Sequence, residues 1–318
     1  MKNILVTGGV GYVGRELVRQ LVDVSADMQI HVVDNLDCGE HRLQAMDTDS
    51  FRLHRIDIRD RDAVCSVLNE IKPDTIYHLA AIHFIPHCEK YPGDAVSRNV
   101  AGTVNLLDAA PEGARFVFAS TAAVYAPENN AHSEDRSTIK PMDIYGWTKL
   151  QGEHFISYYH ENERVDGAVV RLFNVVGSGE TNPHLAPAII EQLSEGNTTV
   201  KLGNLFPHRD YIDVRDAAQG FRRIAGAKSI NRELTLSNLG TGVSYAVGDM
   251  VRLIADSAGI EIEIEVDNDR VRSVDRPMLK ASVEKLRELT NWSPQISLTQ
   301  AMQSAWETRI EDRLRRAL

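Results

Sequence analysis

The chain has 318 residues, enough for about two domains and for a core that needs no disulfide or metal staple. Hydrophobic residues make up 43% and charged residues 25%, ordinary values for a globular protein that exclude disordered, collagen-like and low-complexity classes. With 35 basic and 45 acidic residues the formal charge is −10, opposite in sign to a general nucleic-acid or anionic-membrane binder, so an anionic ligand requires a local basic pocket.

Short apolar runs alternate with helix-length amphipathic segments through the first half of the chain. The runs predicted as strands are Ile4–Thr7, Ile30–Val33, Phe51–Ile58, Thr75–Leu79, Phe116–Ala119 and Ala168–Phe173. The segments predicted as helices are Gly11–Val22, Asp60–Ile71, Asp94–Ala110 and Asp143–Tyr159. This alternation predicts a doubly wound α/β fold of the Rossmann type, whose parallel sheet is covered on both faces.

The alternating pattern loosens after Asn174. Val175–Pro183 is rich in Gly, Ser, Asn and Pro and is predicted to be a linker or substrate loop. Beyond it we expect a helix near Leu185–Leu193, strands near Val200–Leu202, Leu234–Ser237 and Ile260–Val266, and a final helix after Leu298. We therefore expect a first domain of residues 1–173, to which some later segments return, and a smaller α/β cap domain of residues 174–318.

Three glycines, Gly8, Gly11 and Gly14, follow the first predicted strand and open the first predicted helix. One makes the tight turn, one lets a pyrophosphate approach the backbone, and one allows the helix to pack closely on the strand. The N-terminus of the helix offers free N–H groups to the phosphates. The turn therefore predicts a dinucleotide site.

Asp34 ends the second predicted strand about 20 residues after the last of these glycines, where a carboxylate accepts the hydroxyls of an adenosine ribose. The residues that follow it are Asn35, Leu36 and Asp37, so no arginine is placed to meet a 2′-phosphate. This pattern favours NAD over NADP.

Tyr145 and Lys149 form the only Tyr-x-x-x-Lys in the chain, and on a helix their side chains share one face. A phenol with a pKa of about 10 is a poor base at neutral pH. An adjacent ammonium and the positive charge of a nicotinamide would both lower that pKa and make the tyrosine an acid–base group. The alternative is a tyrosine and a lysine on a solvated helix face, which is the weaker interpretation behind a dinucleotide turn.

Ser120 and Thr121 follow the predicted strand Phe116–Ala119, at the edge of the sheet where folds of this kind bind ligands. A hydroxyl there can hydrogen-bond a substrate oxygen as its proton leaves. The alternative, stronger for Ser120, is that the two hydroxyls only cap the end of the strand.

These motifs together resemble the extended short-chain dehydrogenase/reductase superfamily, and most closely its NAD-dependent nucleotide-sugar epimerases of the UDP-glucose 4-epimerase type. The resemblance covers nearly the whole chain. The segments that carry it are Thr7–Gly14, Val33–Leu36, Asp57–Ile58, His78–Ala81, Asn99–Thr103, Tyr145–Lys149, Arg171–Asn174, Arg209–Ile212 and Arg276–Pro277.

The resemblance implies that Thr121, Tyr145 and Lys149 are the catalytic residues. It implies NAD contacts by the glycine turn and by residues spread over the first half of the chain. These are Tyr12 and Val13 on the pyrophosphate, Asp34 and Asn35 on the adenosine ribose, Asp57 and Ile58 on the adenine, Leu79, Ala80 and Ala81 along the middle of the cofactor, and Asn99, Phe173, Tyr145 and Lys149, the last on the nicotinamide ribose.

For the substrate, the resemblance implies that Asn174, Arg209 and Arg276 hold the diphosphate of a nucleotide sugar, which supplies the basic pocket that the acidic chain requires. The other residues implied on the substrate side are His83, Thr121, His184 and Leu185.

Ala122 and Ala123 distinguish between reactions within the superfamily. Dehydratases and decarboxylases of the superfamily carry acidic residues directly after the catalytic threonine, and the reductase-epimerases that make GDP-fucose carry a cysteine in this stretch. Neither is present, which leaves oxidation and reduction at a single carbon. Tyr145 then takes the proton of the sugar 4-hydroxyl, a 4-keto sugar forms, and hydride returns to its opposite face.

Two other functions stay open at this point. One is a net-redox reductase or dehydrogenase with an exchangeable cofactor, and the other is a non-catalytic dinucleotide-binding regulatory protein. The absence of G-x-S-x-G and G-x-x-x-x-G-K-[ST] argues against hydrolase and P-loop functions. His83 and His87 are four residues apart, a spacing at which a helix could bring both to one metal ion, but Pro86 breaks that helix and no further ligand recurs near Cys88, so no metal site is predicted.

The three cysteines, Cys38, Cys65 and Cys88, cannot all pair and form no C-x-x-C, which favours a reducing compartment. The longest apolar run is far shorter than the roughly 18 residues of a membrane span, and the N-terminus enters a strand with no hydrophobic leader. We therefore expect a soluble cytoplasmic protein with no membrane or nucleic-acid partner. The family resemblance implies a homodimer, paired through the helix that carries Phe155 and Tyr158.

Overall fold

The structure is a computed structural model and describes residues 2–24, 27–37, 39–44, 46–180, 182, 184–227, 233–267 and 276–317. Cys38 lies outside these residues. No helix within them is both long enough and apolar enough to cross a membrane.

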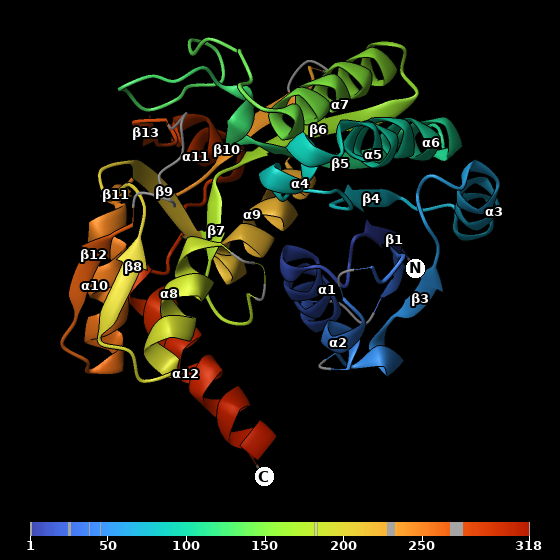
Figure 1. The fold of residues 1–318 in the computed structure, drawn as a ribbon. Coiled ribbons are helices and arrows are strands. Elements are labelled where there is room, and N and C mark those ends of the chain that lie inside the picture. Colours follow the sequence, from blue (N-terminus) through green and yellow to red (C-terminus); the bar gives the residue numbers. More distant parts are fainter. Residues whose placement is uncertain are drawn as a thin grey trace.

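A parallel sheet forms the centre of the molecule, and seven strands of the described chain build it (Figure 1). Their order across the sheet is β10 (Thr235–Leu239), β6 (Val165–Leu172), β5 (Ala114–Thr121), β4 (Thr75–His78), β1 (Lys2–Thr7), β2 (Met28–Asp34) and β3 (Arg52–Arg55), and every neighbouring pair is parallel. The order reverses between β1 and β4, which places a ligand crevice at the carboxyl ends of these two strands. The predicted parallel α/β fold is confirmed.

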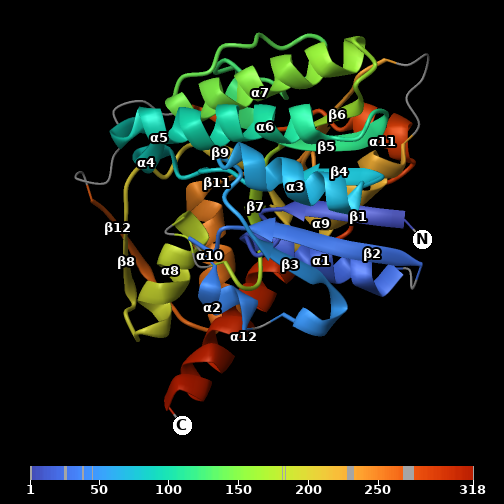
Figure 2. The same cartoon turned by 90° about the vertical axis from the view of Figure 1, so that its right-hand side faces the viewer.

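Helices cover both faces of this sheet, so its central strands are apolar at nearly every position; Phe116, Val117 and Phe118 are fully buried. One face carries α3 (Arg61–Ile71), α6 (Gly102–Ala109) and α7 (Ile144–Glu161), and the other carries α1 (Tyr12–Val24), α9 (Val214–Gly226) and α11 (Glu284–Thr290). Figure 2 shows the resulting layers, with α6 and α7 on one side of the strands and α1 on the other.

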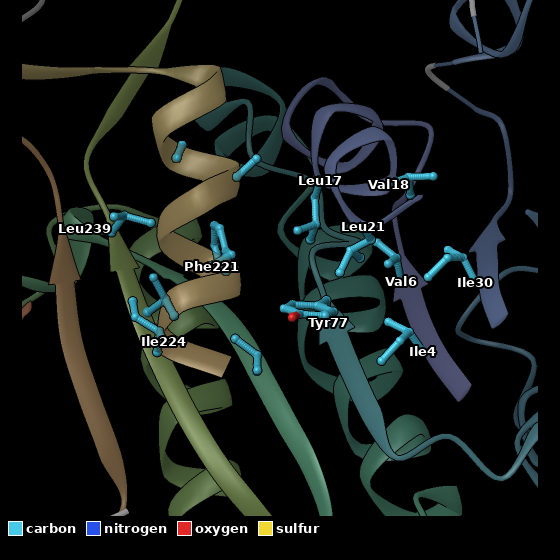
Figure 3. Close-up of a cluster of buried hydrophobic side chains, with 14 of the residues drawn as sticks. Ile4, Val6, Leu17, Val18, Leu21, Ile30, Tyr77, Phe221, Ile224 and Leu239 are labelled. Atoms are coloured by element: carbon cyan, nitrogen blue, oxygen red, sulfur yellow. The ribbon is translucent and has the colours of Figure 1, made fainter. Parts of the chain in front are cut away.

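The helices form where spacing and capping favour them. The buried residues of α1 recur at helical spacing, and its Leu17 and Leu21 lie with Phe221 of α9 over the strands (Figure 3). Asp60 caps α3 by accepting the Ala63 N–H at 3.1 Å, and the helix ends at Lys72 in the left-handed conformation.

A second, smaller body packs beside the sheet, on the left in Figure 1. Its strands are β7 (Asn174–Val176), β9 (His208–Asp213), β11 (Ser244–Ala246) and β13 (Met278–Leu279) in one sheet, and β8 (Thr199–Leu202) with β12 (Glu263–Val266) in another. Its helices α8 (Leu185–Ser194), α10 (Val247–Ala258) and α12 (Leu298–Ala317) share one hydrophobic core with β8.

The chain returns from the smaller body to the large sheet more than once after residue 173. The predicted strand near Leu234–Ser237 is β10, which pairs with β6 in the large sheet. The helices α9, α10 and α11 were not predicted, and α9 and α11 return to the large sheet after residue 173. The predicted helix Asp94–Ala110 is divided into α5 (Pro92–Val96), a π-helical turn (Ser97–Ala101) and α6.

Candidate active site

The glycine turn between β1 and α1 lies tightly against two neighbouring strands. The Gly8 N–H donates to the Val33 carbonyl at 2.9 Å, and Gly8 has a φ of +70°. A Cβ on Gly8 would lie 2.7 Å from the backbone nitrogen of Ala80, and a Cβ on Gly14 would overlap the Gly8 carbonyl oxygen. The turn therefore leaves no room for side chains and brings bare backbone and the start of α1 to the crevice, as a pyrophosphate site requires.

Tyr12 and Val13 are the first residues of α1. The Val13 side chain packs against the core. The Tyr12 ring is buried, and its hydroxyl has no hydrogen-bond partner among the described residues. A pyrophosphate would therefore be met here by the backbone N–H groups of the helix.

Polar groups gather where β2 and β3 end. The Asp34 carboxylate accepts the N–H groups of Val10 at 3.0 Å and Leu36 at 2.9 Å, and burial raises the pKa of Asp34. Asn35 donates to Asp57 at 3.1 Å, so Asp57 lies beside the segment that ends β2. The Arg59 guanidinium holds the pKa of Asp57 well below its usual range.

Two of the predicted cofactor residues are engaged with the protein itself. The Ile58 side chain is buried against Gly102. The Asn99 amide, in the π-helical turn, exchanges hydrogen bonds with the N–H (2.8 Å) and carbonyl (2.9 Å) of Ile82 and donates to the Thr148 hydroxyl at 3.0 Å. Asn99 thus fastens the segment after β4 to α7.

Leu79, Ala80 and Ala81 form that segment, directly at the carboxyl end of β4. The Leu79 N–H continues the sheet by donating to the Thr7 carbonyl at 3.0 Å, and its side chain packs against the core. Ala80 lies against the glycine turn. The three small or apolar residues therefore border the crevice beside the turn.

Thr121, Tyr145 and Lys149 come together at this edge of the sheet. Thr121 is the last residue of β5, and the other two lie one turn apart at the start of α7, which Asp143 caps by accepting the Gly146 N–H at 2.7 Å. The Thr121 hydroxyl hydrogen-bonds to the Tyr145 phenol. The Lys149 ammonium is buried, 4.8 Å from the ring centre of Phe118.

The charge balance of this cluster differs from the prediction that Lys149 lowers the pKa of Tyr145. Burial raises the pKa of Tyr145, as do the neighbouring Cys88 and Asp143, and the hydrogen bond from Thr121 opposes that rise. Burial lowers the pKa of Lys149 to about 7. In the nucleotide-free protein, desolvation disfavours both charged forms and so makes the ammonium less populated near neutral pH; the effect of a bound nicotinamide on the pKa of Tyr145 stays a prediction.

Replacing Lys149 with Met is expected to stabilise the nucleotide-free protein, because it removes a buried ammonium. The unfolded chain binds the lysine proton up to pH 10.5 and the folded chain only up to about pH 7, so wild-type stability rises between these values. The advantage of the variant is full below pH 7 and shrinks by about 1.4 kcal/mol per pH unit above it. Urea unfolding from pH 6 to pH 10.5 measures this; a pH-independent difference would contradict the assigned pKa.

A buried polar network, which the sequence did not predict, lies next to the cluster of Thr121, Tyr145 and Lys149. Glu153, two turns after Tyr145 on α7, forms an ion pair with Arg171 of β6 at 2.7 Å and accepts the Ser120 hydroxyl. Arg171 also donates to the Tyr125 hydroxyl at 3.0 Å. The network ties α7 to the two strands beside it, and Ser120 belongs to it through its hydroxyl.

Replacing Glu153 with Ala is expected to lower the free energy of unfolding by about 3–5 kcal/mol, because the Arg171 charge would stay buried without its partner. Replacing Glu191, whose ion pair with Arg309 lies at the surface, should cost less than about 1 kcal/mol. Urea denaturation of the two variants measures both losses of unfolding free energy. Equal losses would show that the buried ion pair contributes no more to stability than the surface pair.

Several of the predicted substrate-side residues lie on elements of the smaller body. Asn174 begins β7, and its amide nitrogen is buried without a hydrogen-bond partner among the described residues. Arg209 lies on β9 and donates to the carbonyl oxygen of Arg276 at 2.7 Å. The structure therefore brings the two predicted diphosphate arginines together.

His184 and Leu185 lie at the N-terminus of α8, where Leu185 packs into the small core. The rings of His184 and His83 are 5.5 Å apart, and His184 hydrogen-bonds to Glu180 at 2.7 Å. His83 is exposed and lies beside His184. The rings of His83 and His184 therefore lie next to each other.

Phe173, predicted to touch the cofactor, is buried in a cluster with Leu279 and Val124 behind Thr121. Within the described residues, no three His, Cys, Asp or Glu side chains are close enough to hold a metal ion. The Nε2 atom of His87 instead lies 3.2 Å from Oδ2 of Asp94.

Residues 4–238 match the model of the NAD dependent epimerase/dehydratase family. The chain belongs to this family. Its curated relatives include the UDP-glucose 4-epimerase of Rhizobium meliloti, 30% identical over 322 aligned residues that span 96% of this chain and 96% of that protein. Bifunctional protein gal10 of Schizosaccharomyces pombe is 27% identical over 97% of this chain, which spans about half (47%) of that relative.

Among solved structures, the UDP-glucuronic acid 4-epimerase of Bacillus cereus in complex with UDP-glucuronic acid and NAD is similar to this family member, with a TM-score of 0.87 and 26% identity. The match covers 97% of this chain and 99% of that one. The family resemblance drawn from the motifs is confirmed.

Proposed function

We propose that this family member is a nucleotide-sugar 4-epimerase, an isomerase that holds NAD and acts on a UDP-sugar through a 4-keto intermediate. The observation that carries the proposal is the convergence of Thr121, Tyr145 and Lys149 beside the glycine turn, opposite Asn174 and the paired Arg209 and Arg276. The relatives named as UDP-glucose and UDP-glucuronic acid 4-epimerases support the same reaction on different sugars.

The residues of the crevice fit NAD. The bare glycine turn and the start of α1 would hold the pyrophosphate, and Asp34 with Asn35 the adenosine ribose. Asp34 has no arginine directly after it, which favours NAD over NADP. When bound, NAD supplies a hydride acceptor that also returns the hydride.

The protein's own part in the reaction is proton transfer and orientation. Tyr145 takes the proton of the sugar 4-hydroxyl and gives it back, and Thr121 donates a hydrogen bond that stabilises the phenolate. In its protonated form, Lys149 stabilises the same negative charge. Ala122 and Ala123 follow Thr121 without any acid, so no proton is handled at a neighbouring carbon.

The arginines anchor the diphosphate while the sugar turns. Arg209 and Arg276 would bind it as cations, and the unpartnered amide nitrogen of Asn174 would donate a hydrogen bond to it. A fixed diphosphate lets the 4-keto sugar rotate and present its other face to the returning hydride.

The test is proton NMR of UDP-glucose, UDP-galactose, UDP-N-acetylglucosamine and UDP-glucuronic acid, each incubated with purified enzyme and no added cofactor. A C4 epimer from any of them would support the proposal and name the sugar. If no epimer forms and a keto sugar consumes added NADH, the protein is a net-redox reductase instead. Cofactor binding without any turnover would indicate a regulatory protein.

We also propose a homodimer paired through α5 and α7. Apolar side chains are exposed along these two contacting helices, with Tyr158 62% and Trp147 48% exposed, and Val96 and Phe155 beside them. Light scattering is expected to give twice the chain mass of 35.4 kDa, and replacing Tyr158 and Val96 with Arg should halve it. A wild-type protein of single-chain mass would contradict the dimer.

A cytoplasmic location is proposed on the chemistry of the cysteines. Cys65 and Cys88 are free thiols, and burial raises the pKa of Cys88 to about 11. Free thiols of this kind suit a reducing compartment. Cell fractionation that placed the protein in an oxidising compartment would contradict the location.

A further inference from the structure

The Arg276 guanidinium lies between the two segments that carry the acid–base groups. Its Nη2 donates to the Ala123 carbonyl at 3.0 Å and lies 3.4 Å from Oδ2 of Asp143. Ala123 is two residues after Thr121, and Asp143 is two residues before Tyr145. A single guanidinium therefore contacts both sides of the site, and its side chain and that of Asp143 are only 11% and 14% exposed.

Asp143 uses its two carboxylate oxygens for two purposes. Oδ1 accepts the Gly146 N–H at 2.7 Å and caps α7. Oδ2 faces Arg276. A Cβ on Gly146 would lie 2.7 Å from the Ala123 carbonyl oxygen, so the start of α7 packs closely against the turn that follows β5.

The backbone of Arg276 is held from the other side of the crevice. Arg209, on β9 of the smaller body, donates to the Arg276 carbonyl at 2.7 Å. Arg276 is thus fixed at its main chain by the smaller body and at its guanidinium by the wall that carries Thr121 and Tyr145.

We propose that Asp143 is a positioning residue, which holds the Arg276 guanidinium at a fixed distance from Thr121 and Tyr145 so that a diphosphate bound by Arg276 places the sugar at them. This inference rests on the proposed function, because it requires Arg276 to bind the diphosphate. Asp143 itself touches neither the diphosphate nor the reacting carbon.

The test separates the two purposes of Asp143. Asp143→Ser keeps an oxygen that can cap α7 but does not reach Arg276. Asp60→Ser makes the same change at the cap of α3, far from Arg276, and measures the cost of the substitution alone. Both are compared with Arg276→Gln and with the double variant D143S/R276Q. Three properties are measured: the melting temperature, the affinity for UDP by calorimetry, and kcat and KM for the sugar that the NMR panel identifies. The enzyme is used as purified, with the nucleotide that it retains.

We expect Asp143→Ser to weaken UDP binding about five- to tenfold, the loss of one charge-assisted contact, and to raise KM in the same proportion with kcat within about threefold. Its melting temperature should fall by no more than about 2 °C beyond that of Asp60→Ser. In the Arg276→Gln background the serine should cause no further loss of UDP affinity, because the contact is already gone.

Unchanged UDP binding by Asp143→Ser, or losses at 143 and 276 that add, would overturn the inference and leave the proposed function intact. An Arg276→Gln variant that binds UDP like wild type would also overturn it. A wild-type enzyme that binds no UDP would overturn the proposed UDP-sugar function, and the inference with it.

Discussion

Replacing Tyr145 with Phe is expected to lower kcat about a thousandfold and to change KM less than about threefold. The phenol is held by the Thr121 hydroxyl at the end of β5, where the sugar 4-hydroxyl is proposed to lie. The ring stays in place without its oxygen, so the substrate still binds while the proton has no acceptor. The rate of C4 epimer formation, followed by NMR at saturating substrate, measures the loss.

The matched control is Tyr159→Phe on the same helix. Its hydroxyl donates to Asp108, away from Thr121, so the same atom is removed without touching the site. Turnover of this control should stay within about twofold of wild type. Near-normal turnover by Tyr145→Phe would remove the tyrosine from the mechanism.

Replacing Gly14 with Ala is expected to abolish NAD binding and to lower the free energy of unfolding by about 3 kcal/mol. The added methyl group would overlap the Gly8 carbonyl oxygen and lie 2.8 Å from Gly9 Cα. Both contacts are backbone atoms of the turn, so the strain can be relieved only by moving the surface on which the pyrophosphate would lie. Nucleotide released from the denatured purified variant, quantified by chromatography, measures the loss.

Gly226→Ala is the control for this substitution, because a Cβ at the end of α9 meets nothing within 4 Å. Alanine should leave the nucleotide content unchanged and slightly stabilise the helix. A Gly14→Ala variant that retains its nucleotide would show that the turn does not hold the pyrophosphate.

The features predictable from the sequence were those set by local spacing. The glycine turn, Asp34 and the Tyr145–Lys149 pair each lie within one strand–helix unit, so their geometry follows from the period of the helix and the direction of the strand. The return of α9 and α11 to the large sheet depends on contacts between residues far apart in the chain, to which no local pattern is sensitive.

The electrostatics of the site were less predictable than its geometry. The order of the residues indicates that Lys149 is near Tyr145 but not that Lys149 is buried and Tyr145 partly so, and in the nucleotide-free protein this desolvation raises the pKa of Tyr145. The sequence shows Glu153 eight residues after Tyr145, about two turns along the same helix. Its ion pair with Arg171 could not be predicted, because Arg171 lies on a different strand of the folded chain.

The late return of β10, α9 and α11 to the large sheet also bears on how the chain is made. When only the first 173 residues have emerged from the ribosome, β6 has no partner strand on its outer side. Val117 and Val170 are then uncovered, because α9, which packs over them, is not yet synthesised. The nucleotide-binding half cannot complete its core until α9, β10 and α11 have also been synthesised. We expect the two bodies to fold after synthesis as one cooperative unit, with chaperones bound until the chain is nearly complete.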